Sequence, residues 1–565
     1  MLFLPFIISL VAAKSASSLS SASSTTDEFV TVKFAKQLGG YYFDSPVNFE
    51  NGGPDGFSTD ILLRLDLLQP EMWVMNGNAF FNCSHIASWW ASETSLYSAT
   101  ETLPASVTTA PEYLADVCAA DGVYYTHEDS QPSATISGIQ NGDPYTIPYI
   151  NVLNASGVWE TGNLYLNTTQ DEVIIFDNFT FVNVNSTYLP VGGFGVAGNP
   201  RGSGFLNLLR DQGYIKSPGY SLWFNNSTAE LLPGIVDKKY YTGDLYGFDN
   251  VPHQGLRYPN GDPGNNIVGN LNIPSIQLDS IEVVNEYAQQ SVTLTNGPLG
   301  VVFDSRTTYS FLPLNIIINL AIQTNAFFLL EADRWIVQCS KILQSNATLN
   351  FKFGDFKLKI PLSKFLNPAY YNDKILKYNG GAEACYLSFL PSSQNGVIAL
   401  GLNILEEIYL AVDNEGGKIA IASAKKNMDE EEESMSTSQS STNVTTSTST
   451  TVDYIRKGSI PFATTSSRTS QVFLSYSEVS NTIDVSNIPA RFTASVISGE
   501  FFNTDTTNGR TFFDSAASPA TASSRAKNSA NSISNPLKVG QSDTSTKLVT
   551  IFFTIALAAI ALCAL

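Results

Sequence analysis

The chain has 565 residues, with 51 acidic and 31 basic side chains, a net charge of −20 and a sequence pI of about 4.5. This excess of acid argues against a nucleic-acid-binding protein, because affinity for phosphate needs clustered lysine and arginine. Three histidines argue against catalytic zinc and a histidine-based triad, so we expect neither a metal nor a cofactor. Charged residues form 15% of the chain and aromatic residues 12%, a composition typical of β-rich secreted proteins.

The N-terminal residues 1–13, MLFLPFIISLVAA, form an apolar run that ends in small residues. The run is too short to span a bilayer and therefore predicts a secretory signal peptide. It lacks the usual basic residues at its start, so a buried first strand is the alternative interpretation. Residues 14–40 are expected to form a Ser/Thr-rich, pro-like segment.

The composition of residues 41 to about 424 indicates a globular part of the chain. Short β-branched and aromatic runs alternate there with Gly, Pro, Asn and Asp, which predicts an all-β architecture. The runs lie at 147–152, 172–176, 220–224, 276–284, 301–303, 349–353 and 418–422, with helical patches at 204–212 and 314–320.

Nine Asn-x-Ser/Thr sequons support passage through the secretory pathway. They predict N-glycosylation at Asn82, Asn154, Asn167, Asn178, Asn185, Asn225, Asn226, Asn346 and Asn443.

Four cysteines precede the C-terminal tail, which itself carries Cys563. An even number of cysteines in an oxidising compartment predicts disulfides. Proximity in the sequence favours Cys83–Cys118 and Cys339–Cys385.

The C-terminal part changes composition. An acidic run at 429–433 is followed by MSTSQSSTNVTTSTSTT, and we expect a disordered, O-glycosylated stalk over 426–547. Within it, a less biased patch around 454–513 could hold weak structure. Residues 548–565 form an apolar run without charge, the pattern of a glycosylphosphatidylinositol (GPI) signal, with Gly540 or Asn531 as the attachment residue. A tail-anchored helix is the alternative. These features predict anchoring at the outer face of the plasma membrane or in the cell wall.

Several segments of the globular span carry motifs in a characteristic order. They are LPVGGFG (189–195), YSLWFNNSTAELLPGIVDKKYYTGDLY (220–246), GVVFDSRTTYSFLP (300–313), WIVQCS (335–340) and NGVIALGLNILEEIYLAVDNEGGKIAIA (395–422). Together they resemble the pepsin-like aspartic proteases and, within that family, the fungal GPI-anchored yapsins.

The resemblance implies a bilobal fold with a central cleft, an N-lobe at 41–245 and a C-lobe at 246–425. It also implies a monomeric peptidase in which two aspartates, one from each lobe, share a proton because neighbouring like charges cannot both ionise. Each aspartate belongs to an Asp-Thr/Ser-Gly turn, whose glycine lets the two loops approach. A flap tyrosine covers the pair, and Tyr149 lies near its expected spacing.

In the C-lobe motif, Asp304 is present but Arg306 replaces the glycine. A guanidinium beside Asp304 would hold that carboxyl ionised and disfavour a shared proton. The alternative is that Arg306 swings outward and the loop adjusts.

In the N-lobe, two registers compete. In the first, LDLLQPEMWV (65–74) occupies the motif, Asp66 is the catalytic aspartate and Leu67-Leu68 replace Thr-Gly. Leu68 would then push the loops apart. In the second register Asn76 takes the catalytic place, and its amide could neither act as a base nor share the proton. We prefer the first because it accounts for more residues.

The flap also departs from the family pattern. INVLN follows Tyr149 where the family has glycines, and a glycan on Asn154 would crowd the mouth of the cleft. Tyr149 could alternatively be a packed strand tyrosine without a role in the site.

Three functions remain open from the sequence. The first is a yapsin-like endopeptidase acting on secreted or cell-wall proteins. The second is an inactive pseudoprotease that binds a peptide or protein in its cleft, and the third is a mechanical glycoprotein linked to the wall. The residues around the two aspartates favour the second over the first.

Overall fold

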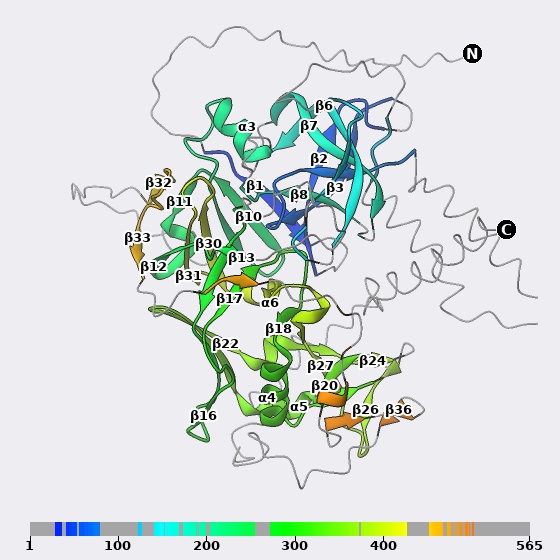
Figure 1. The fold of residues 1–565 in the computed structure, drawn as a ribbon, viewed down its shortest axis with the longest axis vertical. Helices are drawn as coiled ribbons and strands as arrows, with labels where there is room; N and C mark the ends of the chain where they lie inside the picture. The colour runs from blue at the N-terminus through cyan, green and yellow to red at the C-terminus, as the bar shows by residue number, and fades with distance from the viewer. Residues whose placement is uncertain are drawn as a thin grey trace, which may run out of the picture.

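The computed structural model of the chain describes most residues between 29 and 501. The described segments are 29–36, 41–53, 56–78, 122–126, 140–147, 149–151, 153–168, 173–187, 189, 191–198, 204–254, 272–330, 332–371, 374–426, 451–466, 472–475, 480, 483, 485–488, 492–494, 496–497 and 500–501. Figure 1 shows two β-rich lobes stacked along the long axis. The bilobal, mostly β fold expected from the sequence is confirmed.

A 14-stranded sheet contains the N-lobe and the strands that join the two lobes, in the order β33-β12-β31-β30-β9-β10-β1-β2-β3-β8-β4-β7-β6-β5. Its N-lobe strands are β1 (Val32–Lys36), β2 (Phe43–Phe49), β3 (Thr59–Asp66), β4 (Trp73–Met75), β5 (Pro144–Thr146), β6 (Ala155–Asn167), β7 (Val173–Thr187) and β8 (Gly192–Gly195). Strand β5 ends at Thr146, and the described residues of the predicted run at 147–152, which are 147 and 149–151, lie outside strands.

Five strands of this sheet connect the lobes. They are β9 (Tyr220–Phe224), β10 (Thr228–Pro233), β12 (Tyr241–Asp249), β30 (Ile408–Asp413) and β31 (Lys418–Ala424). β30 pairs with both β9 and β31, so a strand from the middle of the chain lies beside two strands that follow the C-lobe sheets. Helix α3 (Phe205–Asp211) precedes β9 and coincides with the predicted helical patch at 204–212.

The C-lobe consists of three main sheets. A five-stranded sheet contains β14 (Ser275–Leu278), β17 (Leu299–Phe303), β29 (Ala399–Leu400), β18 (Ser310–Leu312) and β28 (Phe389–Pro391). A second contains β16 (Gln290–Thr293), β15 (Ser280–Asn285), β21 (Thr348–Phe353) and β22 (Phe356–Pro361), and a third contains β23 (Leu366–Pro368), β27 (Ala384–Leu387), β20 (Arg334–Gln338) and β19 (Phe327–Leu329). The helices are α4 (Leu314–Thr324), α5 (Cys339–Ser345) and α6 (Leu402–Leu405).

The two lobes repeat one local arrangement. In the N-lobe, β3 lies parallel to β8, and β8 lies antiparallel to β4. In the C-lobe, β17 lies parallel to β29, and β29 lies antiparallel to β18. Asp66 is the last residue of β3, and Asp304 directly follows β17. The repeat therefore brings one aspartate from each lobe to an equivalent position.

A C-terminal segment, residues 451–501 as described, returns to the folded body, and we call it the C-terminal strap. β32 (Val452–Tyr454) pairs with β11 (Ile235–Asp237), β33 (Ala463–Thr465) pairs with β12, and β34 (Leu474–Ser475) pairs with β13 (His253–Gln254). Further along, β35 (Thr493–Ala494) pairs with β19, while β36 (Val496–Ile497) and β37 (Glu500–Phe501) join β26 (Lys377–Tyr378). The sequence predicted a disordered stalk over 426–547, and the strap lies within that range.

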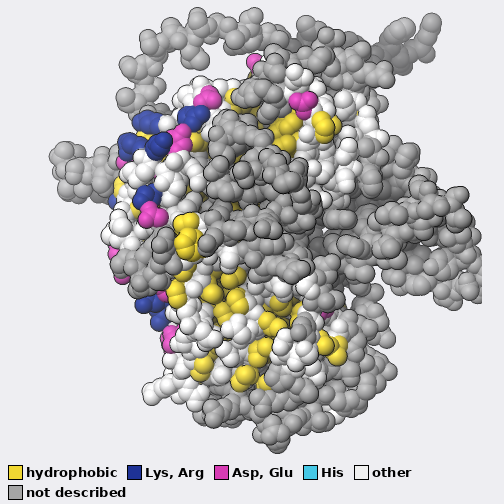
Figure 2. Space-filling model, viewed as in Figure 1, with side chains coloured by type: hydrophobic (Ala, Val, Ile, Leu, Met, Phe, Trp, Pro, Cys, Tyr) yellow, Lys and Arg dark blue, Asp and Glu magenta, His cyan; other side chains and the backbone are white. Residues whose placement is uncertain are grey.

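Lysines hold the first part of the strap. Lys216 Nζ lies 3.4 Å from the ring centroid of Tyr454, and Lys238 Nζ lies 4.1 Å from that of Phe462. Such cation–π contacts add to the strand pairing. In Figure 2 the dark blue Lys and Arg side chains gather along one side of the upper lobe, the side on which Figure 1 places β32 and β33.

Candidate active site

The packing of two glycines shows that Asp66 and Asp304 occupy equivalent positions in the two lobes. A Cβ on Gly195 would lie 2.6 Å from the carbonyl oxygen of Gln69 and 2.3 Å from that of Glu71, residues three and five places after Asp66. A Cβ on Gly401 would meet the carbonyl oxygens of Thr307 and Tyr309 at 2.7 and 2.3 Å, at the same offsets from Asp304. The structure therefore matches Asp66 with Asp304, as in the first register.

Asn76 lies elsewhere. It forms an isolated bridge with Tyr124, and its Oδ1 accepts a hydrogen bond from the backbone N–H of Asn78 at 2.8 Å. Neither contact joins it to Asp304.

One serine ties the two aspartate loops together. Ser305 Oγ donates to the carbonyl oxygen of Leu65 at 2.7 Å and accepts from the N–H of Leu67 at 3.2 Å. Leu67 and Leu68 are fully buried, in two separate apolar clusters. The prediction that leucine would push the loops apart is wrong, because Ser305 bridges the two loops while both leucine side chains are buried beside them.

Arg306 is buried inside the site, with its side chain 1% exposed. Nη1 lies 3.4 Å from Asp66 Oδ2 and 3.3 Å from the carbonyl oxygen of Gly192, and Nη2 lies 2.9 Å from that of Val191. The guanidinium also lies 5.3 Å from the centre of a Trp73 ring. The arginine thus neither swings outward nor pairs with its own lobe's aspartate, and it reaches across to Asp66.

Asp304 meets Arg306 through the backbone instead. The N–H of Arg306 donates to Asp304 Oδ1 at 2.8 Å, and Asn151 Nδ2 lies 3.4 Å from Asp304 Oδ2. Burial raises the pKa of Asp304 to about 7, and the negative charge of the neighbouring Asp66 adds to this rise. The hydrogen bond from the N–H of Arg306 and the positive charge of its side chain lower the pKa but do not cancel the effect of burial. The charge of Arg306 therefore lowers the pKa of Asp304, as expected, but burial outweighs this effect.

Burial also raises the pKa of Asp66. Its partners oppose that rise, the charge of Arg306 most and the hydrogen bonds from Tyr149 and Leu68 N–H less. An arginine in a protein keeps its proton, so the centre is electrically neutral when its two carboxyl groups hold one proton between them. The two carboxyl groups can therefore hold one proton between them without a net charge, even with the arginine beside them.

Tyr149 points into the site. Its hydroxyl donates to Asp66 Oδ2 at 2.7 Å and accepts from Trp73 Nε1 at 3.0 Å, and its side chain is 2% exposed. Burial and the nearby Asp66 carboxylate raise the pKa of Tyr149 well above its usual range. Tyr149 is therefore not merely a packed strand tyrosine, because its hydroxyl contacts Asp66 in the site.

Two residues of the site carried no prediction. Asn151, which contacts Asp304, lies two places after Tyr149 in the divergent flap sequence. Its position so close to the flap tyrosine was the one feature of the sequence that could have indicated a place in the site. Gln69 is fully buried, and neither atom of its side-chain amide has a hydrogen-bond partner. Nothing in the sequence around Gln69 indicated this environment.

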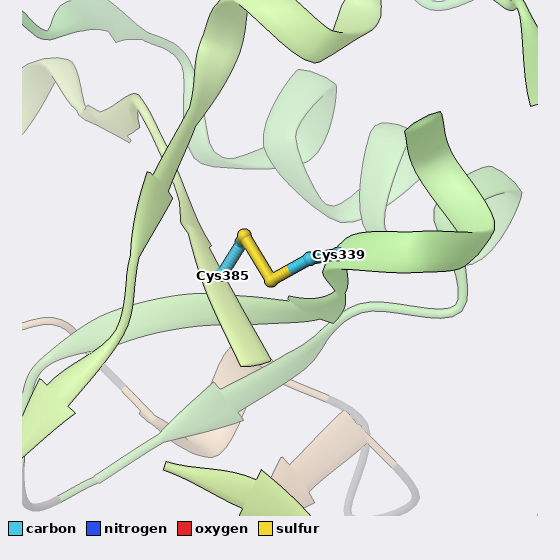
Figure 3. Close-up of a disulfide and its surroundings, with 2 residues drawn as sticks. All are labelled: Cys339 and Cys385. Carbon is cyan, nitrogen blue, oxygen red and sulfur yellow. A yellow bond between two sulfur atoms is a disulfide. The ribbon is translucent and has the colours of Figure 1, made fainter. Parts of the chain in front are cut away.

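The predicted disulfide Cys339–Cys385 is confirmed, with Cα atoms 5.2 Å apart. Figure 3 shows it linking the start of α5 to β27. Cys83 and Cys118 lie outside the described residues, so that pairing remains a prediction.

Most predicted sequons lie in described segments. The exposed ones are Asn167, Asn178, Asn185, Asn226 and Asn346, while Asn154 and Asn225 are half-buried. Asn82, Asn443 and both candidate anchor residues, Gly540 and Asn531, lie outside the described residues, as do 1–13 and 548–565.

Within the part of the chain that the structure describes, no helix is long and apolar enough to cross a membrane. The same part contains no group of three or more His, Cys, Asp or Glu side chains that could hold a metal ion.

The chain matches the family model "Eukaryotic aspartyl protease" over residues 69–424. It belongs to this family. The match covers more than half of the chain and begins three residues after Asp66, while Asp304 lies inside it.

Curated relatives of the family include fungal enzymes. The chain is 27% identical to "Aspartic proteinase yapsin-7" of Saccharomyces cerevisiae over 72% of this chain and 69% of the relative. It is 26% identical to "Aspartic proteinase MKC7" of the same yeast, over 55% and 51%. It is 25% identical to "Secreted aspartic protease 9" of Candida albicans, over 50% and 49%. The chain is therefore yapsin-like, and it spans about half of the length of the last two relatives.

Proposed function

We propose that this yapsin-like protein binds peptide segments of secreted or cell-wall proteins in its cleft and does not hydrolyse them efficiently. The main support for the proposal is that Asp66 Oδ2 accepts hydrogen bonds from two side chains, the Tyr149 hydroxyl at 2.7 Å and Arg306 Nη1 at 3.4 Å. Pepsin-like proteases bind peptides in the same cleft, so the fold supplies the binding part of the function.

Hydrolysis needs a water held between the two carboxyl groups, where one accepts its proton and the other protonates the substrate carbonyl. Here the carboxylate oxygens of both aspartates receive protein donors: Leu68 N–H, Tyr149 and Arg306 on Asp66, and Arg306 N–H and Asn151 on Asp304. Arg306 also stabilises the ionised form of Asp66 and so weakens it as a base. These contacts compete with the water.

The cell surface is the proposed location. The signal-peptide pattern, the sequons and the GPI-type tail support it, and the yapsins and secreted aspartic proteases among the relatives are consistent with an extracellular or surface protein. The anchor, at Gly540 or Asn531, and a link to wall glucan are part of this proposal.

The second candidate is an active aspartic endopeptidase. The pKa of Asp304, raised to about 7, favours it, because a carboxyl that keeps its proton near neutral pH is a suitable general acid. In this case Tyr149 and Arg306 would leave Asp66 when a substrate binds.

Binding and cleavage can be measured separately on the purified protein. We expect pepstatin A to bind in calorimetry and a peptide library to remain uncut between about pH 3 and 7, the range in which a carboxylate pair titrates. Efficient pepstatin-sensitive cleavage that disappears in both Asp66→Ala and Asp304→Ala, but persists in Asn76→Ala, would establish the endopeptidase instead. Absence of both binding and cleavage would favour the mechanical glycoprotein.

A further inference from the structure

We propose that residues 472–475 of the C-terminal strap occupy the cleft beside Asp304, so that a peptide must displace them to bind. This inference rests on the proposed peptide-binding function. The chain would then carry its own competitor for that function, attached downstream of both lobes.

Backbone pairing fixes the position of this segment. β34 lies parallel to β13, with Leu474 opposite His253, and the N–H of Leu474 donates to the carbonyl oxygen of Pro252 at 2.9 Å. Figure 1 shows β13 at the junction of the two lobes, close to β17, with a strand of the orange C-terminal colour beside it.

The segment covers the face of β17 that leads to Asp304. Side chains two places apart along a strand share a face and lie about 7 Å apart, so Gly300, Val302 and Asp304 form one row. The ladder continues through the aspartate, since Val302 N–H donates to Ile398 and Asp304 N–H to Leu400. At Gly300, an added Cβ would lie 2.6 Å from the carbonyl oxygen of Phe473. The strap thus lies against the start of the row that ends in Asp304.

Leu474 fills an apolar site shared by both lobes. Its side chain is fully buried in one cluster with Val302 and Ala399 of the C-lobe and with Trp73 and Tyr149 of the N-lobe. A substrate side chain of the same chemistry, aliphatic and about the size of leucine, would fit the space that Leu474 vacates. The occupant that we infer is therefore an apolar residue of a peptide.

The contact is suited to reversible release. β34 contains two residues, and Phe473 beside it is 41% exposed. Short strand pairing and exposed neighbouring side chains are typical of segments that open locally. The strap is held independently at Ile455, which is fully buried in a different cluster, and at Ser466, whose hydroxyl contacts Asp355. Residues 472–475 can leave the cleft while the strap stays attached.

Two matched variants test the proposal with pepstatin A as the probe. Leu474→Ser removes the apolar group in the cleft, and Ile455→Ser removes one of similar size where the strap contacts the sheet between the lobes. We expect Leu474→Ser to raise the affinity for pepstatin at least about tenfold and Ile455→Ser to leave it unchanged. A third form, Gln254→Cys with Ser475→Cys, joins paired residues of β13 and β34, and its oxidation should abolish binding that a reductant restores.

The outcomes separate the two proposals. Equal affinities of wild type, Leu474→Ser and the oxidised cysteine pair would overturn the strap proposal and leave peptide binding standing. Binding to none of the forms would overturn peptide binding in the cleft and the role of the strap with it. An equal gain in Leu474→Ser and Ile455→Ser would show general loosening of the fold and would also overturn the strap proposal.

Discussion

Arg306 of the C-lobe loop pairs with Asp66 of the N-lobe loop, at 3.4 Å between Nη1 and Oδ2, with both side chains almost completely buried. The pair therefore joins the lobes at the point where the family places its chemistry. The same guanidinium donates to the carbonyl oxygens of Val191 and Gly192, so it also holds the N-terminal side of β8.

Replacing Arg306 by Gln should destabilise the protein by about 3 kcal/mol at pH 7, because Asp66 would remain buried without its counter-charge. Adding Asp66→Asn to Arg306→Gln should recover part of the loss. Urea unfolding measures both values. The control is Arg210→Gln. Arg210 is a half-buried arginine near the surface that pairs with Asp211 and Glu415, and its replacement should cost less than about 1 kcal/mol. Losses that simply add in the double variant would show that the two residues are not coupled.

Asp304 should make the folded state less stable as the pH rises. Its pKa is raised from the ordinary value of 3.8 to about 7 in the folded protein, so between about pH 4 and 7 the folded state binds more protons than the unfolded state. The free energy of unfolding then falls with increasing pH. Asp304→Asn removes this dependence and should stabilise the protein relative to wild type at pH 7, by at most about 4 kcal/mol, and little at pH 4. A constant difference across the range, in urea titrations, would contradict the raised pKa.

Removing the confirmed disulfide, by Cys339→Ala with Cys385→Ala, should lower the free energy of unfolding by about 3 kcal/mol, because the cross-link closes a loop with a sequence separation of 46. The comparison variant is Cys83→Ala with Cys118→Ala, which should show a similar loss if those residues pair. Peptide mapping without reductant gives the connectivity directly. A Cys83 or Cys118 thiol that reacts with a maleimide in the native protein would refute the second pair.

Phosphatidylinositol-specific phospholipase should release the protein from fungal membranes, since the apolar run at 548–565 would have been exchanged for a GPI anchor. Protein linked to wall glucan should instead resist detergent and be released by glucanase. Mass spectrometry of the extracted protein provides the check. Recovery of peptides from 548–565 in the mature protein would show that the tail is retained and would support the tail-anchored helix.

The sequence predicted elements whose residues carry local signals. The run at 220–224 coincides with β9, the patch at 314–320 lies in α4 and the Cys339–Cys385 pair lies within one lobe. The match of Asp66 with Asp304 followed from motif offsets, and the two glycine contacts agree with it.

Other features depended on contacts that a local pattern does not contain. A long arginine side chain can reach either of two carboxyl groups, and the carbonyl oxygens of Val191 and Gly192 direct Arg306 towards Asp66. Leu67 and Leu68 looked obstructive because the sequence does not show which way their side chains turn. The sequence of the strap indicated at most weak structure, because its strand partners are distant in the chain: β32 pairs with β11 from more than 200 residues away.

The place of β12 in the large sheet imposes an order on assembly. Its two neighbours are β31 and β33, and both follow it in the chain, β31 by roughly 170 residues. During synthesis β12 therefore has no strand partner, and its open hydrogen-bonding groups are a template on which other chains can pair. That exposure ends only when the C-lobe is complete and β33 has been made, so the nascent protein passes through a long interval in which it needs protection from aggregation.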